Sequence, residues 1–233
     1  MNNETVADYI HRRNLPLVVF DSCAILDIPR LKYGSATLQI LDQCSKRGAD
    51  KYTYLLPDQV VREIDHHLPK ILSNSFASIN KALSLIVSIE SVNDDSLESR
   101  IQKKRDMIED TVRDIVSRSL KMGESDQIIF NAMSRLIAKK RPAHASKSSH
   151  GDCLVLESLL ICASLLRHDE FDKDILFVTT NPQDFSSNMQ ELKCAPHPDF
   201  AREFSRLRIV YLTDLRPLFH ENSLQKIKEN QNL

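Results

Sequence analysis

The chain has 233 residues, of which 42% are hydrophobic and 27% are charged, and its formal net charge is −1. These proportions are those of a water-soluble globular protein that can bury a large core, and no apolar run is long enough to span a membrane. Only 4 glycines and no tryptophan occur, which argues against an all-β sandwich, and the near-zero charge excludes attraction of the whole chain to nucleic acid.

The 5 cysteines are widely spaced, and no two of them form a CxxC motif. A reduced, cytoplasmic protein uses cysteine in this way, as a small apolar residue and not in disulfides. The N-terminal residues MNNETVADYIHRR are polar and include acids, so we expect no signal peptide.

Strands and helices are predicted to alternate along the first 70 residues. Residues 4–12 have the pattern of a short amphipathic helix, and residues 16–21, PLVVFD, form an apolar run typical of a strand buried on both faces of a parallel sheet. We expect a helix at 36–48 with Gly48 as its C-cap, a strand at 52–56, and a helix that begins at Pro57.

The segment 74–140 has apolar residues at helical spacing almost throughout, which predicts a helical insertion or arm of two to four helices, with Ser125 as one N-cap. Residues 140–150 are loop by composition, and an apolar helix begins after Gly151. Strands at 174–180 and 208–213, a helix near 198–205 and a short C-terminal helix complete the chain. This order predicts an α/β fold, a parallel β-sheet flanked by helices, in a single domain of residues 1–233.

Acidic and polar side chains stand where the predicted strands end. Asp21 ends the first strand, Asn181 and Asp184 follow the third, and Glu63 and Asp152 lie on helices that can point toward the same edge. Oxygen donors without Cys or His ligands suit a hard ion such as Mg²⁺ or Mn²⁺, which can activate a water against a phosphodiester. Each acid alone has an ordinary alternative: a helix cap for Asp21 and Asp152, an exposed helical acid for Glu63, and a turn residue for Asp184.

Four segments resemble, in order, the motifs of the PIN domain family of metal-dependent nucleases. VVFDSCAILD is similar to the opening strand with its Asp, PDQVVREID to the helix that supplies a Glu, HGDCLVLESLLICA to the helix with the third acid, and ILFVTTNPQDFS to the closing strand. The resemblance covers about residues 15–67 and 150–186, with 187–220 as the final strand and helix. The extra length of 74–140 resembles the larger PIN-like members.

The resemblance implies an acidic pocket that binds Mg²⁺ or Mn²⁺ and hydrolyses RNA or structured nucleic acid. Asp21, Glu63 and Asp152 match the acids of the family, whereas Asn181 stands where many members have Asp, and Asp184 could supply that charge. Supporting roles beside the acids fall to Ser22, Thr179 and Glu157. For Glu157 the alternative is an exposed or helix-paired acid.

Basic residues just before Asp152 are the candidate contacts to a nucleic-acid backbone, because Lys and Arg on phosphates supply most of the affinity. The alternative is that these basic residues form a solvated loop. His67, one turn after Glu63, is a further candidate. The full set of candidates is Lys139, Lys140, Arg141, Lys147 and His67. The histidines lack zinc-ligand spacing, no GxSxG motif marks a Ser-His-Asp triad, and no glycine-rich loop suits a nucleotide.

The leading prediction is therefore a cytoplasmic, metal-dependent endonuclease, in particular a ribonuclease. One competing hypothesis is a PIN-like module that binds RNA or a protein through its helical arm without cleaving, which Asn181 favours. Another is a toxin-like component neutralised by an antitoxin-like inhibitor. A homo-oligomer is compatible with each of these hypotheses, whereas no membrane partner is expected.

Overall fold

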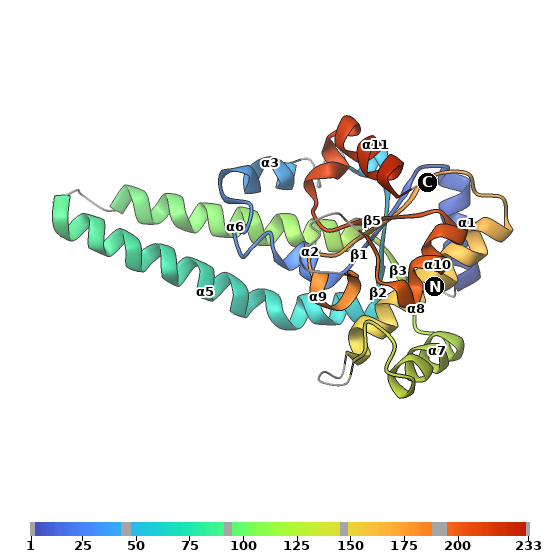
Figure 1. Ribbon diagram of the computed structural model, residues 1–233. Helices are drawn as coiled ribbons and strands as arrows, with labels where there is room; N and C mark the ends of the chain where they lie inside the picture. Colours follow the sequence, from blue (N-terminus) through green and yellow to red (C-terminus); the bar gives the residue numbers. More distant parts are fainter. Residues whose placement is uncertain (1–2, 43–47, 91–94, 145–148, 188–194, 232–233) are drawn as a thin grey trace.

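The computed structural model of the chain describes residues 3–42, 48–90, 95–144, 149–187 and 195–231. At its centre lies a sheet of five parallel strands in the order β3-β2-β1-β4-β5. The strands are β1 (Leu17–Phe20), β2 (Thr53–Pro57), β3 (Leu120–Met122), β4 (Ile175–Val178) and β5 (Ile209–Leu212). Helices flank the sheet, so the predicted α/β fold is confirmed (Figure 1).

β1 is the middle strand, and its sequence explains this position. All four of its residues, LVVF, are apolar and buried, which suits a strand with a neighbour on each side and helices over both faces. Val18 pairs with Tyr54 of β2 on one side and with Leu176 of β4 on the other. Because the strands are parallel, the residues that follow β1 and β4 come out at the same edge of the sheet.

The helices differ widely in length. They are α1 (Asn3–Arg13), α2 (Ser22–Leu26), α3 (Thr37–Asp42), α4 (Gly48–Lys51), α5 (Asp58–Glu90), α6 (Asp95–Arg118), α7 (Asp126–Ile137), α8 (His150–His168), α9 (Pro182–Phe185), α10 (Pro198–Leu207) and α11 (Glu221–Asn230), with short 3-10 helices at Gly34–Ala36 and Arg216–Phe219.

α8 is the central helix of the packing. It contacts α1, α5, α7 and α10 as well as β2, which explains why its sequence is apolar on almost every side. This packing fixes the N-terminal end of α8, where Asp152 lies, relative to the sheet.

A helical hairpin of α5 and α6 extends away from the sheet (Figure 1). α5 runs for 33 residues, about 50 Å, and continues through Pro69. The segment 74–140 thus contains most of this hairpin together with α7, as expected, but it also contains β3, which we did not predict. That residues 1–233 form one domain with an inserted arm stays a prediction.

Three details of the predicted elements are wrong. Residues 120–122 pair with β2 as an edge strand and do not continue a helix. Gly48 begins α4 and is not the C-cap of the helix predicted at 36–48, of which residues 43–47 lie outside the described residues. Pro57 ends β2, and α5 begins one residue later. None of the described helices combines the length and apolar character needed to cross a bilayer.

Candidate active site

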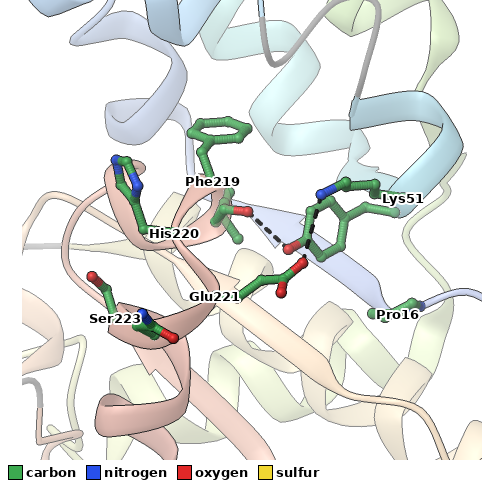
Figure 2. Close-up of a pocket in the computed structure, with 9 residues that line it drawn as sticks. Pro16, Lys51, Phe219, His220, Glu221 and Ser223 are labelled. Atoms are coloured by element: carbon green, nitrogen blue, oxygen red, sulfur yellow. Dashed lines mark hydrogen bonds and ion pairs between the residues drawn. The ribbon is translucent and has the colours of Figure 1, made fainter.

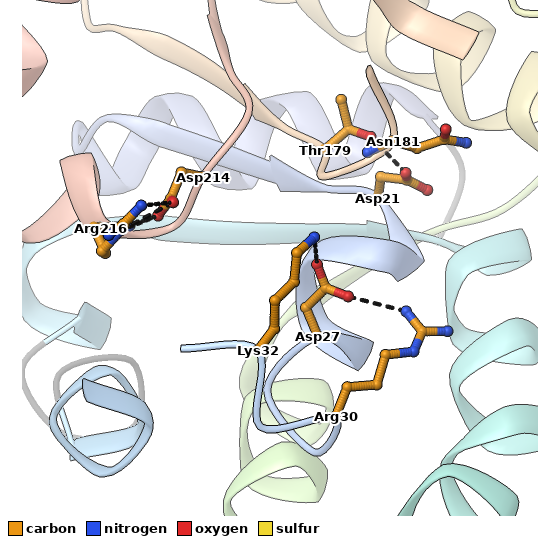
Figure 3. A network of polar contacts seen from close by, with 8 residues as sticks. All are labelled: Asp21, Asp27, Arg30, Lys32, Thr179, Asn181, Asp214 and Arg216. Carbon is orange, nitrogen blue, oxygen red and sulfur yellow. Dashed lines mark hydrogen bonds and ion pairs between the residues drawn. The ribbon is translucent and has the colours of Figure 1, made fainter. Parts of the chain in front are cut away.

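Asp21 lies at the carboxyl edge of the sheet, between the ends of β1 and β4. The Asp21 backbone N–H donates to Val178 O at 2.9 Å, and the Thr179 hydroxyl donates to Asp21 Oδ2 at 2.7 Å. The Asn181 N–H in turn donates to Thr179 Oγ1 at 3.1 Å. Figure 3 shows these three side chains together at the strand ends. The two polar strand ends therefore meet as the sequence predicts.

The Asp21 carboxylate does not cap a helix. Asp21 occupies the N-cap position of α2, but its side chain makes no capping hydrogen bond. The residue is 1% exposed, and its Oδ1 has no hydrogen bond of normal geometry within the described residues. A buried carboxylate oxygen without a donor is costly, and such an atom is where a cation would be expected to bind.

Burial raises the pKa of Asp21 above its ordinary value, and the nearby charge of Glu63 raises it further. Hydrogen bonding to Thr179, and to a smaller extent to Cys23 and the Ser22 amide, acts in the opposite direction. Desolvation is the largest of these effects. The carboxylate is thus held in a place that favours either a proton or a cation.

Glu63 is held near Asp21 by Ser22, the residue that follows Asp21 in the chain. The Ser22 hydroxyl donates to Glu63 Oε2 at 2.5 Å, and Gln59 Nε2, one turn earlier on α5, donates to Glu63 Oε1 at 2.7 Å. α2 packs on α5, which places Ser22 against this turn. Glu63 is therefore an oriented, half-buried acid and not a solvated one.

Asp152 approaches the same place from α8. A Cβ atom added to Gly151 would lie 2.6 Å from Glu63 Oε1, so the first turn of α8 passes directly over the Glu63 carboxylate. Burial raises the pKa of the Cys23 thiol, and the charges of Asp21, Asp152 and Asp27 add to this effect. Asp152 and Asp21 thus both lie near the Cys23 thiol.

Asp21, Glu63 and Asp152 lie at the same edge of the sheet, but their side chains are not tightly clustered. In the described parts of the chain, no three His, Cys, Asp or Glu side chains form a group that could hold a metal ion as they stand. The donor chemistry nevertheless fits a hard divalent cation, because the acids offer carboxylate oxygens and one of these, Asp21 Oδ1, is buried without a donor.

Asp184 is buried but its carboxylate is already engaged. Asn181 Nδ2 donates to Oδ2 at 2.6 Å, while His144 Nε2 and Arg141 Nη1 lie 3.4 Å and 3.9 Å from Oδ1. The next residue, Phe185, is fully buried against Phe177 and anchors α9. Since Asp184 takes the amide N–H of Asn181, the carbonyl oxygen is the atom that Asn181 can offer to a ligand.

Glu157 faces away from these residues. It lies on α8, is 5% exposed, and pairs with Arg135 Nε of α7. Asn131 Nδ2 donates to its other oxygen at 3.1 Å. The alternative of a helix-paired acid therefore accounts for its position, although the pair joins two helices instead of two turns of one.

The candidate backbone contacts come from two parts of the chain, the end of α7 and helix α5. Lys139 and Lys140 are exposed at the end of α7, while Arg141 is partly buried and donates to Gln183 O at 2.6 Å. Lys147 lies outside the described residues. His67 is exposed on α5, and its ring contacts that of His66.

Several polar residues near this edge were missed by the sequence reasoning. Asp214 is the second residue after β5, much as Asp21 directly follows β1, a signal that could have been used, and it pairs with Arg216. Asp27 is 4% exposed and binds Arg30 and Lys32 at 3.0 and 2.5 Å (Figure 3). No local signal marks Gln59, because only the packing of α5 brings it to Glu63.

An open pocket of about 750 Å³ lies at the opposite, amino edge of the sheet. Pro16 and Tyr52, which precede β1 and β2, line it together with the start of α11 (Figure 2). Tyr52 OH donates to Leu218 O at 2.8 Å, and Lys51 and Glu221 lie 3.8 Å apart. The acids described above do not contribute to this pocket.

The protein is of the α/β class, with a parallel sheet whose carboxyl edge carries buried and oriented acids. The particular family follows from comparison: the PIN domain family model matches residues 18–185, and the chain belongs to this family. PIN domains are in general metal-dependent nucleases. No curated protein and no solved structure matches the chain.

Proposed function

We propose that the protein is a metal-dependent endonuclease that cleaves RNA, with Asp21, Glu63 and Asp152 as ligands of Mg²⁺ or Mn²⁺. The observation that carries this proposal is the buried Asp21 Oδ1, which makes no hydrogen bond of normal geometry in the described residues and belongs to a carboxylate near a second acid, Glu63, oriented by Ser22. A hard cation bound there supplies a Lewis acid that activates water and offsets charge on the phosphodiester.

The surrounding side chains hold the acids in position. Thr179 donates to Asp21 Oδ2, which directs the remaining oxygen of that carboxylate toward the site. Ser22 and Gln59 each occupy one oxygen of Glu63, so Glu63 would exchange one of these contacts for the cation. Asp184 orients Asn181, whose carbonyl oxygen adds a neutral ligand or a contact to a coordinated water.

Lys139, Lys140 and Arg141 would contact the RNA backbone, because their segment is tied to the site through Asp184 and Gln183. Lys147 and His67 remain further candidates for this role. The cysteines that the structure describes, Cys23, Cys153 and Cys162, are free thiols. Free thiols are in keeping with a reducing compartment, and we place the protein in the cytoplasm.

The test is cleavage of a labelled single-stranded RNA with Mg²⁺, with Mn²⁺ and with a chelator. We expect cleavage only with the cations, and its loss in Asp21→Asn and Asp152→Asn. Asp110→Asn, which removes an exposed acid of α6, is the matched control and should cleave normally. Calorimetric titration with Mn²⁺ gives a readout independent of cleavage. Full activity of Asp21→Asn would refute the proposal.

A second candidate is a module that binds RNA, or a protein such as an antitoxin-like inhibitor, without cleaving it. The engagement of Asp184 favours this candidate, because the fourth position then offers only the neutral Asn181. Retained RNA binding with no cleavage across both metals and several RNA substrates would support the module over the nuclease.

A further inference from the structure

One face of α7 exposes large apolar side chains. Ile129, Phe130, Met133 and Ile137 are 41%, 68%, 44% and 79% exposed, whereas the helix already packs on α8 through Ile128 and Ala132. With 100° per residue, the four exposed side chains fall within about 100° of the helix circumference. They form one continuous stripe, the apolar face of α7, on the side opposite to α8.

Such a stripe is unusual on a surface helix. A helix with one buried face normally carries polar residues on the other, and contiguous exposed apolar groups mark contact surfaces. Of the seven large apolar residues that are exposed in the described parts of the chain, four belong to this helix of 12 residues. Figure 1 shows α7 at the border of the molecule with its outer side open.

The charges around the stripe identify an occupant. Asp126 begins α7 on the same side as the stripe, and the exposed Lys139 and Lys140 follow its C-terminal end. A second α7 placed antiparallel and centred on Met133 would set Ile129 against Ile137 of the second copy. It would also bring Asp126 near Lys140 of the second copy.

We propose that the apolar face of α7 is the contact surface between two copies of this chain, related by a twofold axis that passes near Met133. The face is complementary to itself in shape, since apolar positions meet apolar positions about the axis. It is also complementary in charge, because each acidic end meets a basic end and the two helix dipoles run in opposite directions.

The contact has consequences that can be measured. One helix per copy forms a small interface, so we expect a reversible dimer with a dissociation constant in about the micromolar range. Because α7 leads into the segment 139–144, which contacts Asp184, the antiparallel pairing would place these two segments at opposite ends of the paired helices. The proposal does not depend on cleavage activity.

The test is sedimentation of the full chain between about 1 and 100 µM, with variants of the face. We expect Phe130→Glu and Ile137→Glu to weaken the dimer by at least about 10-fold, since each places a charge in the apolar contact. Leu85→Glu, at a leucine of the arm that is 59% exposed, is the matched control and should leave the dimer unchanged.

Charge reversal tests the antiparallel arrangement. Asp126→Lys should weaken the dimer, and adding Lys139→Asp and Lys140→Asp to the same chain should restore it, because opposite charges again meet. Thermal unfolding of each variant establishes that α7 remains folded. A monomer at about 100 µM, a dimer that survives both glutamate variants, or no restoration by the charge exchange would each overturn the proposal.

Discussion

Gly151 places the first turn of α8 over Glu63, and replacing it with alanine gives a sharp test of the candidate site. The new Cβ would lie 2.6 Å from Glu63 Oε1 and 2.8 Å from Gln59 Nε2, whereas an ordinary contact needs 3.4 Å or more. The backbone of two packed helices cannot easily yield, so the carboxylate and the amide must move. The Ser22 hydrogen bond to Glu63 would be strained or broken.

Displacement of a catalytic group by about 1 Å costs up to about 100-fold in rate. We therefore expect Gly151→Ala to lower kcat/KM for RNA cleavage by about 10- to 100-fold and to weaken Mn²⁺ binding. Stability should change little. Alanine favours a helix by up to about 1 kcal/mol over glycine, which offsets the weakening of the hydrogen bonds that Glu63 accepts.

The assays are Mn²⁺-dependent cleavage, Mn²⁺ titration by calorimetry, and urea unfolding. Ser164→Ala, the same kind of small change farther along α8, is the control and should leave activity intact. If Gly151→Ala acts through Glu63, it should cause no further loss in a Glu63→Ala background. Undiminished cleavage by Gly151→Ala, or an equal loss in that background, would refute the reasoning.

Three further predictions concern buried acids. Because burial raises the pKa of Asp21 above the unfolded value of about 3.9, the folded state binds more protons there, and the metal-free protein loses stability as the pH rises from about 4. Asp21→Asn should thus have a larger free energy of unfolding than the unchanged chain at pH 7 in the presence of a chelator. In urea unfolding, this difference should shrink as the pH falls toward about 4. Asp184→Asn should weaken Mn²⁺ binding by about 10-fold without abolishing it, since it acts on the site through the orientation of Asn181. Arg135→Met leaves the buried Glu157 without its cationic partner, with only the neutral Asn131 as donor, and should cost about 3–5 kcal/mol, or about 6–20 °C in Tm.

Each of these predictions can be contradicted by a specific result. Equal stability of Asp21→Asn and the unchanged chain at all pH values would argue against a raised pKa of the buried Asp21 carboxyl. Complete loss of Mn²⁺ binding in Asp184→Asn would make Asp184 a ligand itself. Arg113→Met, which removes an exposed pair with Glu109, should cost no more than about 0.5 kcal/mol. A cost as small for Arg135→Met would show that Glu157 is solvated.

Local sequence patterns predicted much of the fold. The apolar runs at β1, β2, β4 and β5 are recognisable because strands buried on both faces need no polar positions. β3 was missed because it has only three residues, and such a short segment has no period of its own. It becomes a strand only because β2 offers it an open edge.

Part of the candidate site could also be predicted from local sequence patterns. Asp21 and Thr179 follow adjacent parallel strands, so their meeting follows from chain order once the fold is known. The hydrogen bond from Asn181 to Asp184 is local, but that Asp184 faces His144 does not follow from the sequence, since residue 144 lies on a distant segment. The partner of Glu157 was equally beyond local inspection.

Which strands are buried and which acids stand at their ends can be read from the amino-acid sequence, because apolar runs and strand-end residues are properties of neighbouring positions. What each acid touches depends on the tertiary structure. Asp21 retains an oxygen that makes no hydrogen bond of normal geometry in the described residues, Asp184 is engaged by His144 and Arg141, and the outer side of α7 remains uncovered. Contacts between distant segments set these differences, and no local pattern encodes them.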